Sequence, residues 1–341
     1  MTTTINRQVR LAARPVGFPK TSDFELVEAA VPEPADGELL VRNSYMSVDP
    51  YMRGRMNDAK SYAPPFQLGE PMYGGAVGVV VESKHPDFSA GDAVTGSQGW
   101  REYDVVPGSA ARKLDLDLAP MTAYLGVMGG TGFTAYVGLL DIGQPKAGET
   151  VFVSAAAGAV GSVVGQIASA MGCRVVGSAG SDAKVDFLTK ELGFDAAFNY
   201  RTVDLEQALS ETCPDGIDVY FENVGGDHLQ AALNHMNPFG RIPACGMISL
   251  YNNAEPVPGP NNLATIVRQR ITMRGFIISD HMDRRGDFER NMAAWLKDGS
   301  VKHYDTVVDG IENAVGAFLG LLQGENIGKM LVKVGPEPGG A

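Results

Sequence analysis

The sequence predicts an α/β protein in which a doubly wound parallel sheet follows a smaller all-β domain. From about residue 124 onward, strand-like segments alternate with helical segments, which is typical of a parallel sheet covered by helices. Before about residue 119, short β patterns are separated by prolines and glycines, as in a small β-barrel. The 341 residues are enough for two domains with separate cores.

Each part of the chain contains identifiable elements. The β-rich part has candidate strands at 39–43, 75–82 and 93–94, and we place its end near residue 122. The tail has a helical pattern at 311–322 and a last strand at 330–334. In the α/β part, after a first strand and helix within 151–168, we expect strands at 173–178, 196–200, 217–223 and 241–248, and helices at 184–192 (ended by Gly193), 204–210 and 230–236.

Residues 151–168 read VFVSAAAGAVGSVVGQIA, a β-branched run followed by a helix that Gly158, Gly161 and Gly165 open. Small residues at such a turn let backbone N–H groups approach a pyrophosphate at the positive end of the helix dipole. The pattern is A-x-x-G-x-x-G and not G-x-G-x-x-G, so glycines that only permit close packing are the alternative. Together with the strand–helix alternation, the turn predicts dinucleotide binding and an oxidoreductase.

The end of the second strand of the α/β part indicates which nicotinamide cofactor is bound. Ser178 stands 20 positions after Gly158, where an acidic residue would hold the ribose 2′-hydroxyl of NAD. Residues 178–181 read SAGS, and Lys184 follows in the first turn of the next helix. Small residues and a cation suit a 2′-phosphate and favour NADP. The carboxylate of Asp182, close in the sequence, would instead favour NAD. For Lys184, the alternative is an ordinary solvated lysine on a helix.

Composition and charge exclude several other classes of protein. The 28 basic and 40 acidic residues give a net charge of −12, which argues against nucleic acid or an anionic membrane as the main partner. The sequence has no unbroken 18-residue apolar run and no apolar segment of a secretory signal at its start. Three widely spaced cysteines, Cys173, Cys213 and Cys245, fit the reducing cytoplasm.

A metal centre is not expected. The first 150 residues contain one histidine, His85, and no cysteine, whereas a catalytic zinc needs a set of such ligands. The remaining histidines show no ligand spacing with the cysteines, and a G-x-S-x-G elbow of a serine hydrolase is absent from the sequence.

Several long motifs carry a specific resemblance. They are SVDPYMRG at 47–54, residues 138–168, DVYFENVGG at 218–226, residues 239–252 and residues 326–334. With them the chain resembles the zinc-independent medium-chain dehydrogenase/reductases, and among these the leukotriene B4 12-hydroxydehydrogenase/prostaglandin reductase group, which includes curcumin reductases and plant alkenal double-bond reductases. One departure is MGGTGFTAY at 128–136, where the family commonly has a proline before the glycine.

The resemblance implies a fold and an activity. The fold would be a GroES-like β-barrel domain, residues 1–122 completed by 308–341, and a Rossmann NADP-binding domain, residues 123–307. The family reduces the carbon–carbon double bond of α,β-unsaturated ketones and aldehydes with NADPH, without metal, and its members are frequently dimers. Ser47 stands where the zinc enzymes have a catalytic cysteine. A quinone reductase of the same superfamily is the nearest alternative, and an NADPH-binding protein without turnover is a third.

The resemblance also implies the site residues. The pyrophosphate would meet Gly158, Ala159, Val160 and Gly161, and the 2′-phosphate would meet Lys184 and Tyr200. Asn223 and Asn326 would lie beside the cofactor. The nicotinamide side would be lined by Cys245, Gly246, Met247, Ile248, Ser249, Leu250, Tyr251, Phe276, Ile277 and Ile278.

Hydride delivery to the β-carbon of an enone leaves an enolate, whose oxygen needs a hydrogen-bond donor. We choose Tyr251, in the motif ISLYN, as the catalytic hydroxyl, because a phenol is protonated at neutral pH. Its alternative role is to brace the proline-rich loop 255–260, and the cofactor ribose hydroxyl is an alternative donor. Tyr51 is the second catalytic candidate. Tyr73 is a further candidate for the cleft, and simple packing with a satisfied hydroxyl is the alternative for both Tyr51 and Tyr73.

Overall fold

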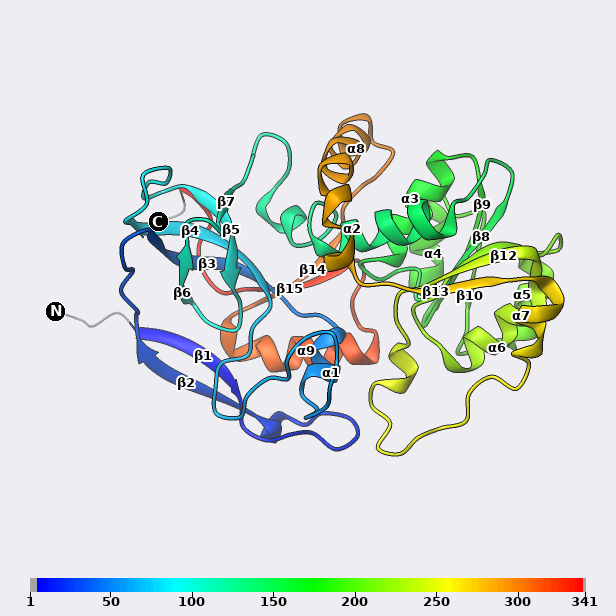
Figure 1. Cartoon of the computed structure of the whole chain (residues 1–341), viewed down its shortest axis with the longest axis horizontal. Coiled ribbons are helices and arrows are strands. Elements are labelled where there is room, and N and C mark those ends of the chain that lie inside the picture. Colours follow the sequence, from blue (N-terminus) through cyan, green and yellow to red (C-terminus); the bar gives the residue numbers. More distant parts are fainter. Residues whose placement is uncertain (1–4, 340–341) are drawn as a thin grey trace. The chain divides into compact units, whose positions relative to one another are not determined.

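The computed structural model describes residues 5–339. The chain divides into two units, one formed by Met1–Leu125 with Asp305–Ala341 and the other by Gly126–Tyr304. The corresponding boundaries expected from the sequence lie at residues 122 and 308. The first unit therefore combines an early and a late segment of the described chain, and the second unit is one uninterrupted segment (Figure 1).

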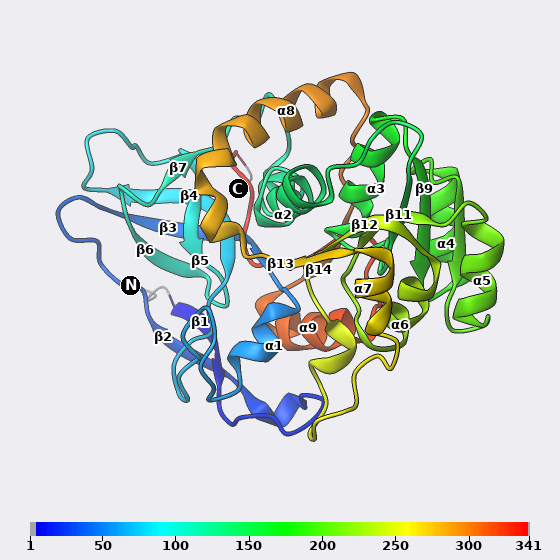
Figure 2. The same ribbon diagram turned by 45° about the vertical axis from the view of Figure 1, so that its right-hand side comes forward.

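The first unit is built around a seven-stranded sheet to which the last part of the chain contributes two strands. The order is β14-β15-β3-β4-β5-β7, with β6 also paired to β3. Trp100, fully buried, stacks on Phe24 at 6.4 Å and meets Phe318 edge-on at 6.0 Å between ring centroids. Figures 1 and 2 show α1 beside α9 in this unit. Its elements are β1 (Ile5–Leu11), η1 (Thr21–Asp23), β2 (Phe24–Ala30), β3 (Glu38–Ser47), α1 (Tyr51–Arg55), β4 (Gly75–Ser83), β5 (Ala93–Gln98), β6 (Tyr103–Pro107), β7 (Arg112–Lys113), η2 (Met121–Tyr124), β14 (Asp305–Asp309), η6 (Ile311–Asn313), α9 (Ala314–Gln323) and β15 (Lys329–Lys333).

The second unit contains a six-stranded sheet in which every neighbouring pair is parallel. Its order is β10-β9-β8-β11-β12-β13, so the chain runs outward from β8 in one direction and then from β11 in the other. In such a sheet, ligands bind outside the carboxyl ends of the two central strands, where the order reverses. Its elements are α2 (Gly130–Tyr136), η3 (Val137–Gly143), β8 (Thr150–Val153), α3 (Gly161–Ala170), β9 (Arg174–Ala179), α4 (Asp182–Lys190), β10 (Ala196–Asn199), α5 (Leu205–Thr212), β11 (Ile217–Phe221), α6 (Gly226–His235), β12 (Met236–Ala244), η4 (Ile248–Leu250), α7 (Ala264–Gln269), β13 (Thr272–Gly275), η5 (Ile278–Arg284) and α8 (Arg285–Asp298).

The sheet of the second unit is apolar on both faces, as a sheet covered by helices requires. All four residues of β8 are buried. α3 packs on β8 and β9, whereas α5 packs on α6 and α6 on α7. Phe152 of β8 stacks on Tyr220 of β11 at 5.0 Å between ring centroids, inside the core that α5 and α6 cover. No described helix combines the length and the apolar character that a membrane span needs.

Three details of the expected elements are wrong. The strand expected at 241–248 is β12, which starts at Met236 and ends at Ala244. It ends there because the backbone N–H groups of Cys245 and Gly246 turn toward the Glu222 carbonyl oxygen. The expected helix 230–236 is α6, which starts earlier, at Gly226. Helix α3 starts at Gly161, so Gly158 lies in the turn before α3 and not in the helix.

Candidate cofactor and substrate site

The turn between β8 and α3 has the features of a pyrophosphate-binding turn. Among the described residues, no acceptor is found for the backbone N–H groups of Ala159, Val160 and Gly161. A Cβ atom at Gly161 would lie 2.6 Å from the Ala155 carbonyl oxygen, so the tight turn requires glycine there. These N–H groups at the start of the ten-residue helix α3 form an anion site of the kind a pyrophosphate occupies.

The third glycine of the motif has a different role. A Cβ atom at Gly165 would lie 2.0 Å from the Phe194 ring, so this glycine lets α3 pack against that ring. The close-packing alternative is therefore correct for Gly165. At Gly158 a Cβ atom would meet nothing nearer than the Ala155 carbonyl oxygen at 3.3 Å, so packing does not dictate glycine there as strictly.

The carboxyl end of β9 gathers cationic and hydroxyl groups. Around Gly180, the Tyr200 hydroxyl lies 3.1 Å and Arg201 Nε 3.3 Å from the position of a Cβ atom. Lys184 stands in the first turn of α4, whose N-cap Ser181 accepts a hydrogen bond from its backbone N–H. Burial, and then the charge of Arg201, lower the pKa of Lys184. A phenol and a guanidinium near Gly180, with Lys184 close enough to Arg201 for their charges to interact, fit a phosphate monoester. Arg201 was missed in the sequence, although a basic residue directly after Tyr200 was a usable signal.

Asp182, whose carboxylate would favour NAD, has a hydrogen-bond partner within the protein. Asp182 Oδ1 accepts a hydrogen bond from Asn199 Nδ2 at 2.8 Å, which ties the carboxylate to the end of β10. Asn199 is itself buried. This hydrogen bond gives Asp182 a structural role at the start of α4. The local charge near Gly180 is then determined mainly by Lys184 and Arg201.

A buried carboxylate organises the carboxyl end of β11. Glu222 Oε1 accepts hydrogen bonds from the Tyr220 hydroxyl at 2.8 Å and the backbone N–H groups of Val224 at 2.6 Å and Gly225 at 2.9 Å. Ser154 Oγ, at the end of β8, donates to the same oxygen at 3.2 Å. Glu222 Oε2 is buried with no partner among the described residues. Burial is the largest influence on Glu222 and raises its pKa.

Asn223, predicted beside the cofactor, joins the ends of the two central strands. Its side-chain Nδ2 donates to the Ser154 carbonyl oxygen at 2.8 Å, and its backbone N–H donates to Ser154 Oγ at 3.0 Å. Its carbonyl oxygen accepts from the Ile248 N–H at 3.1 Å. Asn223 therefore holds the start of η4 against the point where the strand order reverses.

The raised pKa of Glu222 predicts a pH-dependent stability. Folding raises this pKa above its ordinary value of 4.5, so the folded state holds the proton more tightly. The stabilisation is fully present below pH 4.5 and is lost as the pH rises through the folded pKa. We expect the unfolding free energy of the wild type, minus that of Glu222→Gln, to fall as the pH rises above 4.5, by about 1.4 kcal/mol per unit of pKa shift. Urea unfolding of both proteins measures this difference, and a difference that rises with pH would contradict the assignment.

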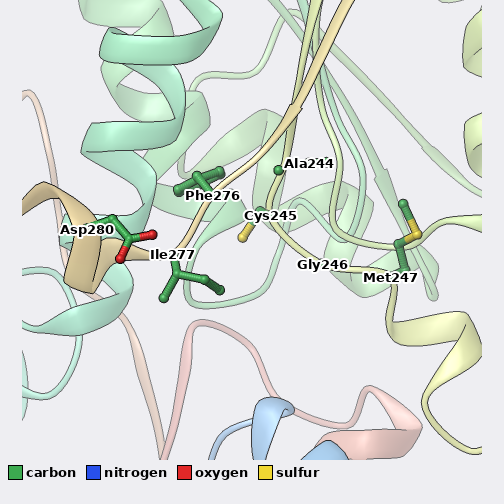
Figure 3. A pocket seen from close by; sticks show the side chains of 8 residues that line it. Ala244, Cys245, Gly246, Met247, Phe276, Ile277 and Asp280 are labelled. Carbon is green, nitrogen blue, oxygen red and sulfur yellow. The ribbon is translucent and has the colours of Figure 1, made fainter. Parts of the chain in front are cut away.

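Residues at the carboxyl ends of β12 and β13 line an open pocket of about 350 Å³. Five of the residues predicted for the nicotinamide side line it: Cys245, Gly246, Met247, Phe276 and Ile277. Figure 3 shows the Cys245 sulfur pointing into the space between the two loops, which face each other across it. The other lining residues are Ala244, Gly275 and Asp280. Asp280 was missed in the sequence, because only its place in η5 brings it to the pocket.

The remaining residues predicted for the nicotinamide side do not line this pocket. Ile248, Ser249 and Leu250 form the short turn η4, in which Ser249 Oγ donates to the Val224 carbonyl oxygen at 2.6 Å. Ile278 starts η5 and lies near Gly130. The contact of these residues with a cofactor stays a prediction.

Tyr251 holds the backbone of the pocket wall. Its hydroxyl accepts a hydrogen bond from the Met247 N–H at 3.4 Å, and it lies 3.0 Å from the position of a Cβ atom on Gly246. Its hydroxyl is thus directed at two residues that line the pocket. The contact with Met247 lies within the loop that contains Tyr251 itself, and a brace toward loop 255–260 stays the alternative role.

Tyr51 and Asn326 belong to the first unit. Tyr51 begins α1, and its hydroxyl lies 3.6 Å from the position of a Cβ atom on Gly74. Burial and then the charge of Asp49 raise the pKa of Tyr51, so it stays protonated and can donate. Asn326, which is buried, donates through Nδ2 to the Gly328 carbonyl oxygen at 2.7 Å.

Other candidates of the first unit are held by their neighbours. Tyr73 accepts a hydrogen bond from Arg55, whose guanidinium also lies over the Tyr73 ring at 4.2 Å from its centroid. Ser47 donates to Asp49, and Asp49 accepts from Lys329 Nζ at 3.0 Å in a buried cluster. The packing alternative thus describes Tyr73.

Metal and thiol chemistry find no support in the described residues. In residues 5–339, no group of three or more His, Cys, Asp and Glu side chains could hold a metal ion. Burial, and then the charge of Glu222, raise the pKa of the Cys245 thiol to about 12. A thiol that stays protonated is a poor nucleophile, so Cys245 acts as part of the wall.

Comparisons with known proteins agree with this geometry. The family described as N-terminal domain of oxidoreductase matches residues 7–114, and the family described as zinc-binding dehydrogenase matches residues 159–298. The NADPH-dependent curcumin reductase of Escherichia coli (strain K12) is 47% identical over 96% of this chain and 97% of its own length. The chain belongs to the medium-chain dehydrogenase/reductases of the curcumin, alkenal and prostaglandin reductase group.

Two further members of this group support the assignment. The NADP(+)-dependent 2-alkenal reductase of Nicotiana tabacum is 45% identical over 97% of this chain and 98% of its own length. The crystal structure of CurA in complex with NADPH from Vibrio vulnificus has a TM-score of 0.92 and 46% identity, and the match covers 97% of this chain and 100% of that one. The family and the fold predicted from the sequence are thereby confirmed.

Proposed function

We propose that this protein is an NADPH-dependent reductase of the carbon–carbon double bond of α,β-unsaturated ketones and aldehydes. The observation that carries the proposal is the apolar pocket at the carboxyl ends of β12 and β13, with the Tyr251 hydroxyl directed at its wall. The group of Lys184, Tyr200 and Arg201 near Gly180 supports NADPH in place of NADH. The names of the curcumin and alkenal reductases support an enone or enal as the acceptor.

The residues of this chain have separate tasks in the proposed reaction. NADPH, when bound, supplies a hydride to the β-carbon of the acceptor. The N–H groups of Ala159, Val160 and Gly161 hold the pyrophosphate, and Lys184 and Arg201 neutralise the 2′-phosphate. Asn223 keeps the strand ends in register beside the cofactor. The lining side chains of Met247, Phe276 and Ile277 offer an apolar wall for the nicotinamide and the acceptor.

Tyr251 and Tyr51 are the proposed donors to the acceptor oxygen. A hydroxyl that accepts one hydrogen bond still carries a hydrogen that it can donate, so the contact with Met247 is compatible with this role. A donor aimed at the developing enolate oxygen stabilises the transition state, and water then supplies the proton at the α-carbon. Tyr51 stays protonated beside Asp49 and offers a second donor, from the segment 47–54. Asn326 stays a proposed cofactor contact.

A panel of acceptors tests the proposal against the quinone alternative. We expect the purified protein to consume NADPH with small enones and enals, to yield the saturated carbonyl compound, and to use NADH at least about tenfold less efficiently. A naphthoquinone is expected to react more slowly than the enones. Fast naphthoquinone reduction without enone turnover would favour a quinone reductase, and NADPH binding without turnover on any acceptor would contradict an enzyme.

Partner and location are part of the proposal. β13 pairs with β12 on one side and forms an edge of the sheet of the second unit. Exposed strand edges pair readily with other strands, which supports a homodimer. Cys173, Cys213 and Cys245 are free thiols, which supports the reducing cytoplasm.

A further inference from the structure

We propose that the Asp280 carboxylate stabilises the oxidised, positively charged nicotinamide ring in the pocket formed by β12 and β13, and thereby favours hydride donation. This inference rests on the proposed function, because it assumes that the nicotinamide occupies this pocket. It assigns a role to a lining residue that lies outside the motifs of the family resemblance.

Asp280 is held at the pocket by the turn that follows β13. It is the third residue of η5, and its backbone N–H donates to the Ile277 carbonyl oxygen at 3.1 Å. This bond closes a tight turn directly after Phe276 and Ile277, which form one wall. Figure 3 shows Asp280 beside these residues, with a carboxyl oxygen turned toward the space into which the Cys245 sulfur also points.

The pocket carries one fixed charge, and it is negative. Apart from Asp280, the lining consists of glycine and apolar residues and Cys245, whose thiol stays protonated because burial raises its pKa to about 12. The two guanidinium groups that follow Asp280 in the chain are paired with other carboxylates: Arg284 with Asp141 at 3.0 Å, and Arg285 with Glu289 at 2.7 Å. Among the described residues, Asp280 forms no ion pair.

A carboxylate in this place distinguishes the two redox states of the cofactor. The reduced nicotinamide ring is neutral and the oxidised ring carries one positive charge, so Asp280 attracts only the oxidised ring. Apolar walls strengthen the attraction, whereas the exposure of Asp280 to solvent weakens it. For a pair about 5 Å apart at a partly aqueous dielectric, the expected effect on binding is about fivefold.

The test compares the affinities of one protein for NADP⁺ and NADPH. In Asp280→Asn we expect the Kd for NADP⁺ to rise about fivefold at low salt and the Kd for NADPH to change less than about twofold. Asp280→Ser should show the same shift in the Kd ratio, and Asp280→Glu should largely retain the wild-type ratio. The matched control is Asp283→Asn, because Asp283 lies exposed in the same turn η5 and does not line the pocket. Its Kd ratio should remain that of the wild type. Titration of the full-length protein without acceptor gives each Kd, independently of turnover.

The outcomes separate this inference from the proposed function. An unchanged Kd ratio in both neutral variants would overturn the role of Asp280. The same shift in Asp283→Asn would also overturn it, because a general effect of net charge would then explain the result. If the wild type reduces enones in either case, the proposed function stands without the inference. If the wild type binds neither NADP⁺ nor NADPH, the proposed function itself fails.

Discussion

Lys184→Ala is expected to raise the Kd for NADPH by about ten- to hundredfold and to leave the Kd for NADH within about twofold. A charge-assisted hydrogen bond to a phosphate is worth roughly 1.5–3 kcal/mol, which corresponds to this range. Lys184 stands in the first turn of α4, close enough to Arg201 for the two charges to influence each other. The 2′-phosphate distinguishes the two cofactors, so a lysine that binds it must affect only one of them. Fluorescence titration with each cofactor measures both constants.

The matched control for Lys184 is at the other end of the same helix. Lys190 is the last residue of α4, and it pairs with Asp186 at 3.0 Å on the surface. Lys190→Ala removes the same charge from the chain, and we expect both constants to stay within about twofold of the wild type. Arg201→Ala should act as Lys184→Ala does. Equal losses of NADPH and NADH binding in Lys184→Ala would remove the case for a phosphate contact.

Tyr251→Phe is expected to lower kcat for a small enone by about a hundredfold, with the Kd for NADPH within about threefold. The loss of one donor to a developing oxyanion has an effect of this size. The phenylalanine retains the ring and removes the hydroxyl that contacts the Met247 N–H. Single-turnover measurement of NADPH oxidation gives the rate of the chemical step directly.

Two comparisons separate the catalytic role of Tyr251 from its contact with Met247. If the hydroxyl only braces the loop, Tyr251→Phe should weaken NADPH binding as much as it slows turnover. Tyr51→Phe, from the other unit, should lower kcat if Tyr51 is a second donor. A rate in Tyr251→Phe within about threefold of the wild type would contradict the assignment and favour the ribose hydroxyl as the donor.

The sequence predicted the sheet of the second unit well because its signals are local. Buried β-branched strands, helices ended by glycine and the turn at Gly158 and Gly161 each depend on neighbouring residues alone. Helix α8 was missed, although Phe288 and Met292 form a buried helical stripe and Gly299 (φ +80°) ends the helix. The helical pattern of α8 is visible in the sequence, but α8 lies outside the alternation of strands and helices on which the prediction was based.

The site was predicted less completely because long-range contacts shape it. The sequence identified Lys184 and Tyr200, and the pairing of β9 with β10 brings Tyr200 together with its neighbour Arg201 to the carboxyl end of β9. Glu222 was read as part of a motif, and one of the four hydrogen bonds to its Oε1, from Ser154, depends on the pairing of β8 with β11. Asp280 reaches the pocket through a tight turn that no periodicity reveals.

Deuterium transfer tests the central claim most directly. The chelator-treated protein is given NADPH that carries deuterium at both C4 positions, together with a small enone, and the product is analysed by NMR. We expect one deuterium on the β-carbon of a saturated ketone, with no effect of the chelator. Deuterium on the carbonyl carbon of an alcohol, or activity that disappears with the chelator and returns with zinc, would contradict the account.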